Sequence, residues 1–66
     1  MLNVADLQAF VGLDYHDSWI QVCVLDRDGE VLRNDRVENQ LGAVVDFVDR
    51  ALDGRIVTGV AIESCC

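Results

Sequence analysis

The sequence predicts a small α/β domain with three antiparallel strands, one helix, and a last strand parallel to the first. Three observations support this fold class. Two apolar runs, residues 10–15 and 56–63, each end on or beside an acid. An Asp-Gly turn joins two further strand-like runs, and one amphipathic stretch precedes the last run. Because a helix between two strands permits a right-handed crossover, the last strand can lie parallel to the first.

The first three strands are expected over residues 10–15, 19–25 and 30–37. The polar turn at 16–18 separates the first two. Asp28-Gly29 marks a hairpin between the second and third, since glycine supplies the positive φ that such turns need. The third strand is rich in charge, which is typical of an edge strand that avoids pairing with other chains.

A helix is expected from the N-cap Asn39 to about Leu52, ending at Asp53-Gly54, where glycine can adopt the left-handed cap. One apolar stripe is expected on it. Its members are Leu41, Val44, Val45, Val48 and Leu52. The run at 56–62 is almost continuously apolar and predicts a strand buried on both faces.

Size and composition limit the classes of protein to which the chain can belong. The chain has 66 residues and an apolar fraction of 52%, which suits one small globular domain. We expect a lead-in over residues 1–9 and the domain over residues 10–66. The first residues lack the basic region and apolar core of a signal peptide, and no apolar run is long enough to cross a bilayer. We therefore expect a cytoplasmic protein without membrane contact.

Twelve acids and five bases give a net charge of -7. This balance argues against binding a nucleic-acid backbone by charge alone, but it is compatible with a metal-binding nuclease core. The cysteines, Cys23, Cys65 and Cys66, are odd in number and lack zinc-site spacing, so we expect reduced thiols.

Asp14 and Glu63 are the candidate catalytic and metal-binding residues. If the last strand lies beside the first, both acids reach the same end of the sheet. Two neighbouring carboxylates repel each other, and a divalent cation such as Mg²⁺ or Mn²⁺ relieves that repulsion through oxygen ligands. The alternative interpretation is that both are ordinary strand-end acids facing water.

Several segments resemble the opening of the insertion-sequence DEDD transposases. These are residues 10–16 and 21–26, the hairpin at 28–32, and residues 61–66, where a Glu ends a buried strand and cysteines follow. The resemblance implies part of an RNase H-like, RuvC-like catalytic domain. It also implies cutting and rejoining of DNA with four acids and divalent metal, with Asp14 the first acid and Glu63 the second. A guide RNA selects the target in that family.

The chain also departs from the family pattern. The third and fourth acids and the serine-bearing domain would lie beyond residue 66, and Asp17 replaces a lysine that many members carry. We expect either an N-terminal fragment of a longer frame or the remnant of a decayed element, inactive alone. DNA and guide RNA would be contacted through the missing parts, and Mg²⁺ or Mn²⁺ would bind only in the complete domain. The open sheet edge predicts marginal stability or self-association.

Two other functions stay open. A sugar-kinase or actin-like ATPase also begins with strand, Asp, turn and strand, but its phosphate loop needs Gly, Ser or Thr where this chain has Tyr15-His16-Asp17. A small non-catalytic protein could bind a partner or repress a related transposase.

Single residues near the two acids also have two interpretations each. His16 either contacts a phosphate or assists proton transfer, or it is a turn residue with a solvated ring. Trp19 either stacks on a base or belongs to the core or an interface. Ser64 lies next to Glu63, but no base is placed to make it a nucleophile.

Overall fold

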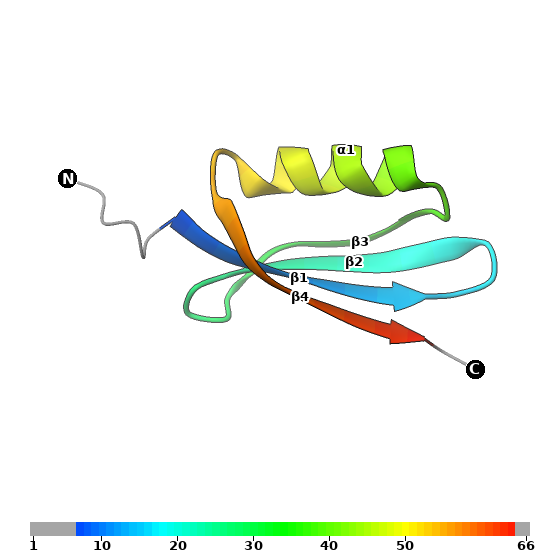
Figure 1. Cartoon of the computed structure of the whole chain (residues 1–66), viewed down its shortest axis with the longest axis horizontal. Coiled ribbons are helices and arrows are strands. Elements are labelled where there is room, and N and C mark those ends of the chain that lie inside the picture. Colours follow the sequence, from blue (N-terminus) through cyan, green and yellow to red (C-terminus); the bar gives the residue numbers. More distant parts are fainter. Residues whose placement is uncertain (1–6, 65–66) are drawn as a thin grey trace.

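The computed structural model describes residues 7–64, in which a four-stranded mixed sheet carries one helix (Figure 1). The elements are β1 (Gln8–Tyr15), β2 (Trp19–Asp26), β3 (Val31–Glu38), α1 (Leu41–Leu52) and β4 (Ile56–Ser64). The strand order is β3-β2-β1-β4, with the first three strands antiparallel and β4 parallel to β1. The predicted α/β architecture is confirmed. Strand β1 begins two residues earlier than expected, and Cys65 and Cys66 lie outside the described residues.

The β2–β3 hairpin is built on Asp26. Its Oδ1 accepts hydrogen bonds from the backbone N–H groups of Asp28 and Glu30, both at 2.9 Å. Gly29 has a φ of 84°, a conformation that side chains disfavour. The predicted Asp-Gly turn is thus confirmed, and the carboxylate before it fixes the loop.

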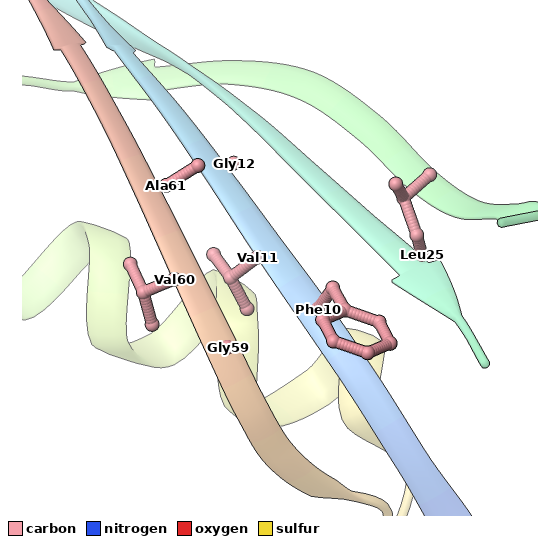
Figure 2. A pocket seen from close by; sticks show the side chains of 7 residues that line it. All are labelled: Phe10, Val11, Gly12, Leu25, Gly59, Val60 and Ala61. Carbon is pink, nitrogen blue, oxygen red and sulfur yellow. The ribbon is translucent and has the colours of Figure 1, made fainter.

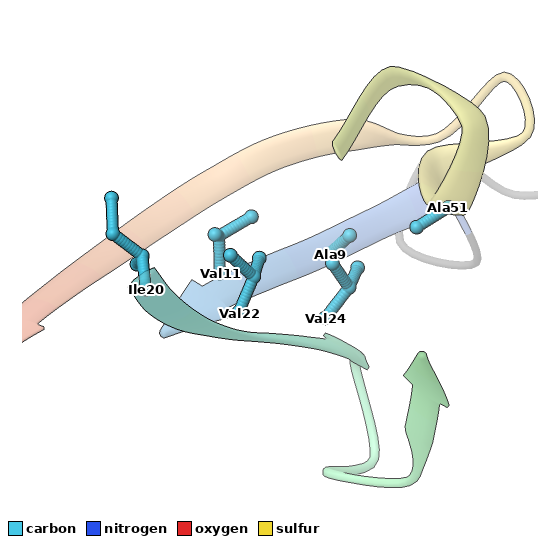
Figure 3. Close-up of a cluster of buried hydrophobic side chains, with 6 residues drawn as sticks. All are labelled: Ala9, Val11, Ile20, Val22, Val24 and Ala51. Carbon is cyan, nitrogen blue, oxygen red and sulfur yellow. The ribbon is translucent and has the colours of Figure 1, made fainter. Parts of the chain in front are cut away.

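The core is a thin layer of apolar side chains between the sheet and α1 (Figure 3). The strands that α1 contacts most are β3 and β2. The buried residues of the core are Ala9, Val11, Ile20, Val22, Val24 and Ala51. Since strand side chains alternate between faces, every second residue of β1 and β2 enters this layer. We call this side of the sheet the helix face and the other side the open face.

The stripe through which the helix packs agrees with the predicted one at Val44, Val48 and Leu52 and differs at the other positions. Val44, Phe47, Val48 and Leu52 pack against the core beside the buried Ala51. The prediction was wrong for Leu41 and Val45, which are 81% and 57% exposed. The spacing i, i+3, i+4, i+7, i+8 from residue 44 gives one continuous face, and Leu41 and Val45 flank it.

The helix ends also differ from the prediction. The N-cap is Gln40, with extended backbone and no side-chain cap hydrogen bond, instead of Asn39. The Asn39 N–H instead donates to the Ser18 carbonyl oxygen at 3.4 Å, which ties the residue before the helix to the β1–β2 loop. The helix ends at Leu52 as predicted. Asp53 takes the left-handed cap with φ 48°, and Gly54 follows with φ 86°.

Strand β4 is an edge strand, so the prediction that it is buried on both faces was wrong. Ile56, Val57, Val60 and Ile62 are all between 37% and 63% exposed, since within residues 7–64 only β1 lies beside this strand. The pairing with β1 shifts register at Thr58, whose Oγ1 donates a hydrogen bond to the Ala9 carbonyl oxygen at 3.2 Å.

The described part of the chain contains no helix with the length and apolar character needed to cross a membrane.

Candidate metal centre

The topology brings the two predicted acids together. In the parallel pairing of β1 with β4, Asp14 is the register partner of Glu63, one residue before each strand ends. Register partners on neighbouring strands project to the same face, and adjacent strands lie about 4.8 Å apart. Both carboxylates therefore leave the open face at the same end of the sheet. This end is the one at which α/β sheets commonly build their sites.

A shallow depression borders the two acids because the residues beside them are small. It has a volume of about 200 Å³. Its lining residues are Gly12, Leu13, Asp14, Gln21, Cys23, Ala61 and Glu63. Gly12 and Ala61 are register partners, so little side-chain bulk stands between the acids and the middle of the strands. The open face thus offers room beside both carboxylates.

A second depression, of about 300 Å³, continues along the same two strands (Figure 2). Gly12 and Ala61 line both hollows, and Phe10, Leu25 and Gly59 line this one. Phe10 therefore borders one hollow and the acids Asp14 and Glu63 border the other, with Gly12 and Ala61 common to both.

Asp14 has an imidazole neighbour within reach. His16 Nε2 lies 3.3 Å from Asp14 Oδ2, and the two side chains are 28% and 45% exposed, respectively. The backbone N–H of His16 donates to the Trp19 carbonyl oxygen at 2.9 Å, which closes the β1–β2 turn. His16 is a turn residue as expected, but its ring is only partly solvated because it stacks on Trp19.

The ring of His16 is part of a stacked column. His16 and Trp19 have centroids 3.8 Å apart and planes inclined by 17°. On β3, the Arg36 guanidinium carbon lies 4.4 Å from the centroid of the Trp19 ring. Cation–π attraction and stacking both favour this arrangement. The column orients the imidazole beside Asp14, and Trp19 has a local structural role outside the buried core.

Sequence reasoning missed Gln21 as a neighbour of the site. It is the antiparallel register partner of Asp14, and its Nε2 donates to Asn34 Oδ1 at 2.8 Å. The alternation of side chains between the two faces of a strand could have identified Gln21 from the sequence. Trp19, Gln21 and Cys23 must share a face, and the hairpin geometry places that face with Gly12 and Asp14. The missing information was the length of the β1–β2 turn, which sets the register.

The donor set fits part of a Mg²⁺ or Mn²⁺ site. Carboxylate oxygens are the preferred ligands of these hard cations, and Mg²⁺ commonly takes one or two carboxylates and completes its shell with water and phosphate oxygens. Among residues 7–64, no three His, Cys, Asp or Glu side chains form a group that could hold a metal ion. The pair therefore needs further ligands from solvent, substrate or other polypeptide.

Comparisons of the chain with protein-family models, with curated proteins and with solved structures found no match.

Proposed function

We propose that the chain supplies the first two metal-binding acids, Asp14 and Glu63, of an RNase H-like catalytic domain of the DEDD transposase type. Such a domain serves DNA transposition and recombination by metal-dependent cleavage and transfer of DNA strands. The observation that supports this most directly is the register of the two acids on adjacent parallel strands. The motif resemblance named the same two residues from the sequence alone.

Each residue near the site has a defined task in this proposal. Asp14 and Glu63 bind the cation, and a bound Mg²⁺ or Mn²⁺ supplies activation of water or a hydroxyl and charge stabilisation at phosphorus. His16 orients the Asp14 carboxylate from 3.3 Å, and Trp19 fixes the plane of that imidazole. The small residues Gly12 and Ala61 leave the open face accessible next to the acids.

The partners follow from the same resemblance, and the compartment is the one expected from the lack of signal-peptide features at residues 1–6. DNA and a guide RNA are the proposed nucleic-acid partners, in a cytoplasmic protein. With a net charge of -7, this chain does not provide the cationic surface that a phosphate backbone needs. We therefore assign DNA and RNA contact to other polypeptide and assign cation binding to this chain. Alone, the chain is expected to bind metal weakly and to leave DNA uncut.

The turn after Asp14 supports this proposal over the ATPase alternative. A phosphate-binding loop needs free backbone N–H groups that converge on the anion. Here the His16 N–H is used within the turn, where it donates to the Trp19 carbonyl oxygen. The residues of the turn, Tyr15 to Asp17, are bulky or anionic.

A Mn²⁺ titration followed by NMR tests the site. Paramagnetic broadening should begin at the amides around Asp14 and Glu63, and Asp14→Asn or Glu63→Gln should weaken binding at least about tenfold, since each removes one of two carboxylates. Asp17→Asn is the matched control, because it removes an equal charge from an exposed position three residues away. Equal weakening by the control would show that only general acidity attracts the ion.

A chimera tests the transposase assignment itself. Residues 10–64 would replace the corresponding segment of an active DEDD transposase, and transposition would be counted in cells. We expect activity that is lost with Asp14→Asn and with Glu63→Gln but kept with Asp17→Asn. Unchanged transposition in the Asp14 and Glu63 variants would contradict the assignment.

A further inference from the structure

We infer that Gln21 is a positioning residue of the candidate metal centre, where its side-chain amide orients the water of hydration of a cation held by Asp14 and Glu63. This role rests on the proposed function and adds to it a residue from a third strand. In the sheet, Asp14 pairs with Gln21 on one side and with Glu63 on the other. Because register partners project to the same face, the three side chains form one row across the open face.

The place of Gln21 is set by described residues on both sides. Its strand, β2, lies between β3 and β1, so Gln21 has a register partner on each neighbour. Gln21 is partly buried and lines the hollow of about 200 Å³ that Asp14 and Glu63 also line. A hollow of this size can hold several water molecules, and the three polar side chains give these waters partners. The amide and both carboxylates therefore border one volume of solvent.

A hydrogen bond to β3 orders the Gln21 amide. Its Nε2 donates to Asn34 Oδ1 at 2.8 Å. Asn34 is the register partner of Cys23, which also lines the hollow, so the bond draws the amide along the sheet toward the hollow. A free glutamine side chain has many rotamers, and ordering it in advance removes much of that entropy cost from binding. The bond uses one of the two amide N–H donors and leaves the Oε1 acceptor for another partner.

A neutral acceptor suits this position better than a charged group. Mg²⁺ that is bound through one or two carboxylates keeps several water molecules, and these waters are hydrogen-bond donors. Gln21 lies one strand beyond Asp14, so its amide meets that water shell and not the ion. A carboxylate here would add to the repulsion between Asp14 and Glu63 in the metal-free chain, and an ammonium group would compete with the cation for both acids. Outer partners of this kind commonly raise metal affinity by ordering the site.

His16 and Gln21 have different tasks beside the same carboxylate. His16 Nε2 lies 3.3 Å from Asp14 Oδ2 and holds the acid directly. Within residues 7–64 the Gln21 side chain bonds to Asn34 and to neither acid. Loss of the Gln21 amide should therefore leave the acids in place and remove only an interaction that needs the hydrated cation. A pair of polar strand residues that served the sheet alone would have no effect on metal binding.

A Mn²⁺ titration followed by electron paramagnetic resonance, which reports the free ion, tests this role. Gln21→Met keeps the length of the side chain and removes the acceptor oxygen. It should weaken Mn²⁺ binding about tenfold, as losses of outer partners at metal sites do. Gln8→Met is the matched control, because Gln8 is a partly buried glutamine of β1 on the same face, six residues and about 20 Å from Asp14. Equal binding by the natural chain and Gln21→Met, or equal weakening by the control, would overturn the inference.

Two further variants separate positioning from damage to the fold. Gln21→Glu keeps an acceptor oxygen and should bind Mn²⁺ at least as tightly as the natural chain, whereas a variant with a damaged sheet would not. Asn34→Ala frees the Gln21 amide and should weaken binding by less than Gln21→Met does. In a Gln21→Met background it should change Mn²⁺ affinity no further, because the group that it orders is gone. Weak binding by Gln21→Glu, or additive effects of Asn34→Ala and Gln21→Met, would also overturn the inference.

The same titration distinguishes failure of this role from failure of the proposed function. If Asp14→Asn and Glu63→Gln bind Mn²⁺ as the natural chain does, the proposed metal site is wrong and the role of Gln21 fails with it. If both acid variants lose affinity and Gln21→Met does not, the site stands and only the role of Gln21 is wrong.

Discussion

The two outer strands of the sheet, β3 and β4, meet solvent in opposite ways. Half of the eight residues of β3 are charged, namely Arg33, Asp35, Arg36 and Glu38. Strand β4 has no charge before Glu63 and exposes four large apolar side chains. The helix packs over β3 and makes little contact with the half of the sheet formed by β1 and β4.

This difference shows that the two edge strands of one sheet can differ in whether they permit pairing with a strand of another chain. Charged side chains and a covering helix make pairing with another chain unfavourable at β3. At β4 neither protection exists, and the candidate metal ligands lie on this same unprotected half. The fold therefore covers β2 and β3 with its helix, whereas β4 carries exposed apolar side chains and pairs only with β1 within residues 7–64.

The largest expected effect comes from removing the helix that covers β2 and β3. Ala51→Asp introduces a charge at the one buried helix position, 7% exposed, and should lower the free energy of unfolding by about 3 kcal/mol. Urea unfolding followed by far-UV circular dichroism measures this loss. Val45→Asp, on the same helix but 57% exposed, is the control and should change stability by less than about 0.5 kcal/mol. Equal effects would mean that the helix is not docked as described.

An intermediate effect is expected where β4 packs against β1. A Cβ at Gly59 would lie 2.9 Å from Cδ1 and 3.3 Å from Cε1 of Phe10, so Gly59→Ala must displace the ring and should cost about 1 kcal/mol. Gly12→Ala is the control, because its nearest neighbour is the Cys23 carbonyl oxygen at 4.0 Å. That variant should be neutral or slightly stabilising. The cost at Gly59 should vanish in a Phe10→Ala background, and an unchanged cost there would exclude the ring as its cause.

The smallest expected effect tests whether the charges of β3 stabilise the fold as well as block pairing. Arg36→Gln removes the guanidinium from the Trp19 ring and should cost about 0.5 to 1 kcal/mol, with a change in Trp19 fluorescence. Arg50→Gln removes an exposed helical ion pair with Asp46 and should cost less, about 0.3 kcal/mol. If both variants lower the free energy of unfolding by the same amount, the contact of Arg36 with Trp19 stabilises the fold no more than an ordinary surface charge does.

Much of the architecture was predictable because its signals are local. The Asp-Gly hairpin, the helix end at Leu52 and the crossover to a parallel last strand follow from turn chemistry and connection rules. From these rules the pairing of Asp14 with Glu63 was predictable too. The structure then adds the exact partners of each strand, which depend on turn lengths that the sequence only suggests.

The predictions that failed concern burial. An apolar run such as residues 56–62 indicates that a strand favours burial, but it does not reveal whether a neighbour is present. The helix stripe failed at Leu41 and Val45 because the apolar arc is wider than the surface that β2 and β3 offer. Likewise the stack of His16 on Trp19 depends on a tight turn, and no periodic pattern encodes it.

The hydrogen bond from Thr58 to Ala9 joins residues 49 positions apart in the chain. By contrast, Asp26 closes its hairpin within four residues. Closing long loops costs more chain entropy, and distant contacts tend to form late in folding. We therefore expect the hairpin to form first and β4 to dock last, when the chain is otherwise assembled. The two acids then become neighbours only in the final folding event, so metal affinity would report completed folding rather than assist its early steps.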